Sequence, residues 1–136
     1  MGRVSHFEIT ADDPERAAAF YRKAFGWEIN DWGGPFKYLL ASTGATDQIG
    51  INGAIMERND SKQAAILTIS VDTWEAGARA VKEAGGTMLM EKTPVPGQGY
   101  FAYAKDTEGN VFGIFEADAT AAQEGAPVGV SQERTA

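Results

Sequence analysis

The chain has 136 residues, 43% of them hydrophobic and 23% charged, and its formal net charge is −7. This composition fits one ordinary globular domain with a hydrophobic core, and an acidic chain with scattered Lys and Arg is not a nucleic-acid binder. No apolar run reaches the roughly 20 residues of a membrane-spanning helix, and zero cysteines exclude disulfides and thiolate metal sites, so we expect a cytoplasmic protein.

The first predicted element is a strand, in which apolar Phe7 and Ile9 alternate with His6, Glu8 and Thr10. A period of two places the apolar set on one sheet face and the polar set on the other. His6 is the only histidine of the chain. Histidine is the side chain most often used to bind metals and to move protons near neutral pH, so this strand is the first candidate for a site.

A helix is predicted next, with Asp12 as its N-cap, Pro14 in its first turn and Glu15 completing a capping box. Apolar residues recur at helical spacing up to Phe25, and Gly26 ends the helix. Three short strands are then expected, at about Trp27–Trp32, Phe36–Ser42 and Gly50–Met56. The polar segment 57–63 links this half of the chain to the next.

The second half repeats the first at a shift of about 60 residues. The segment from Ile9, "ITADDPERAAAFYRKAFGW", falls on "ISVDTWEAGARAVKEAGGT" from Ile69, and "GINGAIME" falls on "GNVFGIFE". A strand around Leu67 is followed by a helix with Asp72 as N-cap and Glu75 three positions on. Three strands are again expected: Thr87–Glu91, Tyr100–Lys105 and Asn110–Glu116.

Two connections in this half carry turn signals. Asp106–Gly109 is predicted as a hairpin turn, because glycine supplies a positive φ at its sharp end. The segment Pro94–Tyr100, "PVPGQGY", is predicted as a loop. After Glu116 the periodicity is lost, and small and polar residues dominate.

Two βαβββ modules, with "FYRKAFGWEI" in the first and "YFAYAKDTEGNVFGIFE" closing the second, resemble the vicinal oxygen chelate superfamily of glyoxalases, bleomycin-resistance proteins and extradiol dioxygenases. The resemblance implies an α+β fold, a curved cup-like mixed sheet with helices on its convex face. We expect one domain over residues 1–117, with module one at about 3–57 and module two at about 64–117. Residues 118–136 are expected to form a flexible C-terminal tail.

In metal-dependent members of this superfamily, the first and last strands of each module present the metal ligands. Carried over one position at a time, these ligands fall on His6, Ile66, Gly53 or Ala54, and Gly113. Only His6 can bind a metal, so no metal cofactor is expected. An alternative stays open, in which His6 and Glu8 on one strand face hold Mg²⁺ or Mn²⁺ with carboxylates from elsewhere.

The sequence therefore predicts a glyoxalase-like protein that binds a small, partly apolar molecule in the cup. The expected ligand-binding residues are His6, Glu8, Met56, Thr68 and Phe115. One or two members of an aromatic cluster are expected to wall the cup as well: Trp27, Trp32, Phe36 and Tyr38.

The alternative is a lyase- or dioxygenase-like enzyme that uses His6 and Glu8 as catalytic residues, with a non-standard metal or none. In it, the Glu8 carboxylate would orient the imidazole of His6. The resemblance also implies a homodimer, and neither nucleic acid nor membrane is an expected partner.

Overall fold

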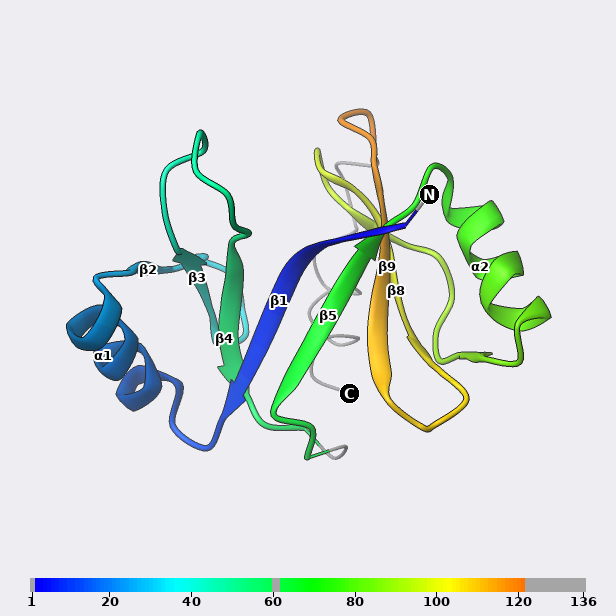
Figure 1. The fold of residues 1–136 in the computed structure, drawn as a ribbon. Coiled ribbons are helices and arrows are strands. Elements are labelled where there is room, and N and C mark those ends of the chain that lie inside the picture. Colours follow the sequence, from blue (N-terminus) through cyan, green and yellow to red (C-terminus); the bar gives the residue numbers. More distant parts are fainter. Residues whose placement is uncertain (1, 60–61, 122–136) are drawn as a thin grey trace.

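The computed structural model describes residues 2–59 and 62–121, and Figure 1 shows their arrangement. The first module contains β1 (Arg3–Ala11), α1 (Pro14–Phe25), β2 (Glu28–Asp31), β3 (Tyr38–Ser42) and β4 (Gly53–Glu57). The second contains β5 (Ala65–Ser70), α2 (Trp74–Glu83), β6 (Thr87–Met88), β7 (Thr93–Val95), β8 (Gly99–Lys105) and β9 (Val111–Ala117).

All strands belong to one mixed sheet of order β2-β3-β4-β1-β5-β9-β8-β6, with β7 paired to β8. The two modules meet where β1 runs antiparallel to β5, and each of these strands has the last strand of its own module as a parallel neighbour on the other side. In Figure 1, β1 and β5 cross the middle of the molecule, and the two helices lie at opposite ends. The α+β fold of two βαβββ modules in a curled, cup-like sheet is confirmed.

The alternation in the strands decides which side chains face the helices and which face the cup. Ile9 of β1 packs in the cluster that buries Ala18 of α1 against Leu39 and Ile55 of the sheet. The equivalent cluster of the second module joins Ala78 of α2 to the sheet. On the other sheet face, a third cluster contains seven buried residues: Tyr38, Ala54, Met56, Ile66, Phe101, Tyr103 and Val111.

Both helices begin one residue later than predicted. The N-cap of α1 is Asp13, whose carboxylate accepts a hydrogen bond from the backbone nitrogen of Arg16, and Asp12 lies outside the helix. The reason is Pro14, which disfavours helical backbone in the residue before it, so Asp13 is extended. In α2 the cap is Thr73 rather than Asp72.

The two glutamates of the expected capping boxes bind lysines instead. Glu15 accepts a hydrogen bond from Lys37 at 2.9 Å, and Glu75 accepts one from Lys92 at 2.7 Å. The bond from Lys92 lowers the pKa of the Glu75 carboxyl, and the same contact raises the pKa of Lys92.

The segment predicted as a loop at Pro94–Tyr100 is a hairpin. Its two arms are β7 and the start of β8, with Pro94 opposite Tyr100. Proline is tolerated here because β7 pairs with β8 alone and is an edge strand. The predicted turn at Asp106–Gly109 is confirmed, since Gly109 has a φ of 83° and the Asp106 carboxylate accepts from two backbone nitrogens of the turn.

The predicted flexible tail, residues 118–136, lies outside the described residues from position 122 onward. Within the part of the chain that is described, neither helix has the length and apolar character needed to cross a membrane.

Gly53 lies opposite Phe7 where β4 pairs with β1, and its substitution tests this register. A Cβ atom there would lie 2.4 Å from the backbone oxygen of Phe7 and 2.5 Å from its ring. We expect Gly53→Ala to lower the free energy of unfolding by about 1–3 kcal/mol, because backbone has to shift. Urea denaturation measures this change.

The matched control is Gly44→Ala. A Cβ atom at Gly44 would meet only the end of the Gln48 side chain, which can move. Its expected effect is within about 0.5 kcal/mol. Equal stability of the two variants would contradict the pairing of β1 with β4.

Candidate functional site

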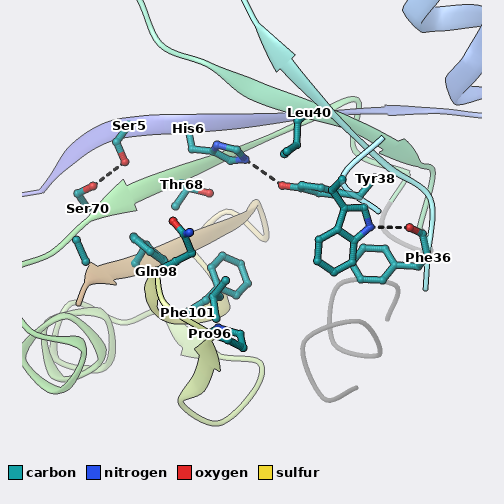
Figure 2. A pocket seen from close by; sticks show the side chains of 14 residues that line it. Ser5, His6, Phe36, Tyr38, Leu40, Thr68, Ser70, Pro96, Gln98 and Phe101 are labelled. Atoms are coloured by element: carbon teal, nitrogen blue, oxygen red, sulfur yellow. Dashed lines mark hydrogen bonds between the residues drawn. The ribbon is translucent and has the colours of Figure 1, made fainter. Parts of the chain in front are cut away.

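The concave face of the sheet encloses a cavity of about 710 Å³. Its walls come from both modules, mainly from β1, β3, β5, β8 and β9, and from the turn between β7 and β8. Figure 2 shows the lining side chains converging on this space. The hollow predicted from the resemblance is therefore present, and its chemistry follows from which residues the strands point into it.

One wall of the cavity carries neutral hydrogen-bonding groups. The register of β1 against β5 shifts between Val4 and His6. A bulge of this kind re-aims side chains, so that the adjacent residues Ser5 and His6 both line the cavity. The hydroxyls of Ser5 and Ser70 lie 2.6 Å apart. Together with Thr68 and Gln98 they form the polar side in Figure 2.

Aromatic rings form the opposite wall. The Trp32 indole nitrogen donates a hydrogen bond to the backbone oxygen of Phe36 at 2.9 Å, which fixes the indole against the Phe36 ring. Tyr38 packs edge-on against both rings. Phe101 and Phe115, from β8 and β9, supply further apolar surface. The cavity thus offers a ring-lined half and a hydrogen-bonding half, a combination typical of small-molecule sites.

A buried carboxylate lies directly behind this cavity. Glu8 has no solvent exposure, and both of its oxygens accept hydrogen bonds of 2.6 Å, one from the hydroxyl of Tyr38 and one from that of Tyr103. Tyr38 also lies 2.9 Å from Nε2 of His6. The result is a continuous chain from His6 through Tyr38 and Glu8 to Tyr103, and its two ends belong to different modules.

The expected site residues divide into two groups. His6, Thr68 and Phe115 line the cavity. Glu8 and Met56 are instead buried in the wall, with exposed fractions of 0% and 3%, and are not among the lining residues. Ligand contact therefore stays a prediction for all five residues.

Only some residues of the aromatic cluster and of the "PVPGQGY" segment line the cavity. Trp32, Phe36 and Tyr38 line the cavity, whereas Trp27 stacks on Tyr21 of α1 at the convex face. Gln98 and two neighbours of its turn reach the cavity as well.

Tyr103 is the residue that sequence reasoning missed. A signal was present, because in β8 bulky Phe101 and Tyr103 alternate with the small residues Ala102 and Ala104. This period of two assigns Phe101 and Tyr103 to one sheet face. That Tyr103 meets Glu8 could not be foreseen, since the two residues are 95 positions apart.

The four positions of the superfamily's metal ligands do not fit a metal ion here. Of the two candidates on β4, Ala54 packs in the cup-side cluster, whereas Gly53 faces Phe7. Ile66 is fully buried in the same cluster. At Gly113, a Cβ atom would lie 2.7 Å from the Phe101 ring and 3.2 Å from the Thr68 hydroxyl, so a ring occupies the space of a ligand side chain.

His6 is thus the one metal-binding side chain at these four positions. Nor do residues 2–59 and 62–121 contain any group of three or more His, Cys, Asp or Glu arranged to hold a metal ion. The alternative ion at His6 and Glu8 would have to compete with the two tyrosine hydroxyls for the Glu8 oxygens.

Comparison with known proteins places the chain among relatives of this architecture. A family model described as Glyoxalase/Bleomycin resistance protein/Dioxygenase superfamily matches residues 3–114. A glyoxylase-like domain-containing protein of Didymella fabae is 32% identical over 83% of this chain and 92% of its own. A probable lactoylglutathione lyase of Vibrio parahaemolyticus is 27% identical over 85% of this chain and 91% of its own.

Among solved structures, a methylmalonyl-CoA epimerase of Streptomyces coelicolor in complex with 2-nitronate-propionyl-CoA superposes with a TM-score of 0.62. The match covers 88% of this chain and 97% of the epimerase, at 17% identity. At this identity the likeness concerns the fold.

The two tyrosines that hold Glu8 are tested by removing one hydroxyl at a time. We expect Tyr38→Phe and Tyr103→Phe each to lower the free energy of unfolding by about 1–3 kcal/mol, because each removes one hydrogen bond to a buried carboxylate. Chemical denaturation measures the loss.

Tyr100→Phe is the control on the same strand as Tyr103. The hydroxyl of Tyr100 makes no hydrogen bond within the described residues, and its ring contact with Lys92 survives the change. We expect Tyr100→Phe to lower the free energy of unfolding by less than about 0.5 kcal/mol. A loss as large as that of Tyr103→Phe would contradict the role of the Glu8 bonds.

Proposed function

Because the chain belongs to the glyoxalase/bleomycin resistance protein/dioxygenase superfamily, we propose that it binds a small, partly apolar molecule in its cup without a metal ion. The observation that carries this proposal is the cavity itself, ring-lined on one side and hydrogen-bonding on the other. Its volume of about 710 Å³ lies within the range of roughly 300–1,000 Å³ usual for small-molecule sites.

The aromatic wall supports an apolar body for the ligand. Flat rings bury a large area at little conformational cost, and Trp32 is further restrained by its hydrogen bond to Phe36. The polar wall supports a smaller hydrogen-bonding part, which Thr68, Gln98 and the serine pair could orient. A metal is not needed to hold such a molecule, and the filled space at Gly113 argues against one.

Two tryptophans on opposite sheet faces test the binding site. We expect naphthol, a neutral two-ring probe, to bind the protein, and Trp32→Leu to weaken this binding by about tenfold, the effect of losing about 1.4 kcal/mol of ring contact. Trp27→Leu is the control, because Trp27 packs on Tyr21 away from the cavity. Isothermal titration calorimetry measures both.

An equal loss of naphthol binding in the two variants would contradict the proposal. So would an unsubstituted protein that binds none of a panel of neutral ring compounds.

Metal removal gives a second test. If no metal ion is bound in the cup, dialysis against EDTA leaves the melting temperature unchanged. Elemental analysis of the purified protein then finds well under one equivalent of divalent metal. A metal that binds only the folded protein would instead stabilise it, by about 2.7 kcal/mol at a metal concentration 100 times Kd. A full equivalent of bound metal whose loss lowers the melting temperature would contradict the proposal.

One observation favours an enzyme as the second candidate function. His6 lines the cavity and is joined to the buried Glu8 through Tyr38, an arrangement that can orient an imidazole for proton transfer. The relatives named lactoylglutathione lyase supply the first reaction to assay.

We predict for this candidate that His6→Ala abolishes turnover of lactoylglutathione while the melting temperature is retained. Lys23→Ala, a change at an exposed residue of α1 that does not line the cavity, should keep the activity. Turnover that survives in His6→Ala would discard the catalytic role of His6. The homodimer also stays a prediction, and light scattering of the purified protein tests it.

A further inference from the structure

Thr68 is a buried threonine whose hydroxyl has no partner within the described residues. It lies on β5 with an exposed fraction of 4%, and Figure 2 shows its side chain at the wall of the cavity. In residues 2–59 and 62–121, the Trp74 indole nitrogen is the one side-chain nitrogen or oxygen that is both sealed from solvent and without a hydrogen bond. The Thr68 oxygen, which also makes no hydrogen bond there, is therefore not sealed and opens onto the cavity.

A second buried threonine shows how the fold treats a hydroxyl that belongs to its structure. Thr10 on β1 is 3% exposed, and its hydroxyl donates a hydrogen bond to the backbone oxygen of Gln63 at 2.7 Å. A hydroxyl that is taken out of bulk water without such a bond costs free energy. Thr68 thus carries a donor that the described part of the protein leaves for a molecule in the cavity.

The serine pair offers a second hydrogen-bonding point on the same face. Ser70 lies two residues after Thr68 on β5, so both side chains point to one side of the sheet, roughly 7 Å apart. The hydroxyls of Ser5 and Ser70 share one hydrogen bond of 2.6 Å, and neither makes another within the described part of the chain. Two hydroxyls carry two hydrogens and this bond uses one, so the pair presents one O–H donor to the cavity.

The lining of the cavity favours an uncharged molecule. None of the described residues that line it is Lys, Arg, Asp or Glu. A carboxylate or an ammonium group that entered would lose its hydration without gaining a fixed opposite charge. A neutral polar group needs only the hydroxyl partners that are already there.

We propose that Thr68 and the serine pair are specificity-determining residues, and that the cup takes a neutral ring compound with two separated hydrogen-bonding groups. One group binds the buried Thr68 hydroxyl, and the other binds the serine pair, of which Ser5 is exposed. The ring body lies against the aromatic wall. A diphenol, a quinone or a hydroxylated ring ketone has this chemistry. This inference rests on the proposed ligand-binding function and names the class of ligand.

Urea denaturation of the ligand-free protein separates a hydroxyl kept for a ligand from a structural one. We expect Thr10→Val to lower the urea midpoint, because a hydrogen bond to Gln63 is lost. Thr68→Val removes a hydroxyl that has no partner in the described residues and keeps the branched shape, so we expect its midpoint to stay or rise. A fall in Thr68→Val as large as in Thr10→Val would overturn the proposal, since the hydroxyl would then be structural.

Isothermal titration calorimetry with two probes measures what the Thr68 hydroxyl contributes to binding. Naphthol and naphthalene share the ring body, and only naphthol has a hydroxyl. We expect Thr68→Val to weaken naphthol binding about fivefold, the effect of one neutral hydrogen bond, and not to weaken naphthalene binding. Thr87→Val is the control, because Thr87 is an exposed threonine of β6 that does not line the cavity. No loss for naphthol, or an equal loss for both probes, would overturn the role of Thr68.

Two naphthalenediols test the spacing of the two points. In one diol the hydroxyls lie at the two ends of one long edge, and in the other they are adjacent. We expect the first to bind at least about fivefold more tightly, because it can reach Thr68 and the serine pair together. Replacing both serines, Ser5→Ala with Ser70→Ala, should abolish this difference. Two diols of equal affinity for the unsubstituted protein would overturn the two-point inference.

A charged analogue tests the neutrality of the ligand. We expect the diacid with carboxylates at the two ends of the long edge to bind at least about tenfold more weakly than the corresponding diol. A diacid that binds as well as the diol would overturn this inference while the ligand-binding function stands. If neither naphthalene, naphthol nor any other neutral ring compound binds, the proposed function itself fails.

Discussion

A carboxylate that is shielded from water has to find hydrogen-bond donors inside the protein, and the concave side of this sheet is organised around that requirement at Glu8. Its two donors are Tyr38 of the first module and Tyr103 of the second. An unpaired charge in such a place would cost several kcal/mol, so the bonds constrain how the two modules join. They also fix the rings of both tyrosines, one of which forms part of the cavity wall.

The two modules share a plan and differ in the residues that matter for chemistry. Under the 60-residue shift, Glu8 corresponds to Thr68 and His6 to Ile66. Because β1 and β5 are antiparallel neighbours, His6 lies opposite Thr68 and Glu8 opposite Ile66. At this junction β1 therefore carries the ionisable residues His6 and Glu8. The facing residues of β5 are Thr68, which offers a hydroxyl, and the apolar Ile66. This asymmetry places the network of His6 and Glu8 in the first module, without an equivalent at Ile66 and Thr68.

A packed ring fills one of the positions in the described part of the cup at which metal-dependent relatives carry a ligand. At Gly113 the absence of a side chain lets the Phe101 ring approach β9 and Thr68, and this contact helps to close the apolar half of the cavity. In the polar half of the cavity, the bulge in β1 lets Ser5 line the wall beside His6. The surface at which metal-dependent members of the superfamily carry ligands is thus occupied here by packed and hydrogen-bonding side chains at the positions described.

The sequence by itself determined the order of the elements, the two-module plan and the face of each strand, because these depend on local periodicity and on the repeat. It also placed His6, Thr68 and Phe115 on the cup side, and the resemblance to metal-dependent relatives put the other usual ligand positions at Ile66, Gly53 or Ala54, and Gly113. It did not place the helix caps, where Pro14 shifts the first by one residue, or the β7 hairpin at the sheet edge. Only the tertiary structure decided that Glu8 lies within the wall and that Tyr103 reaches it, because hydrogen bonds between residues 95 positions apart depend on sheet curvature and strand register, which no local pattern encodes.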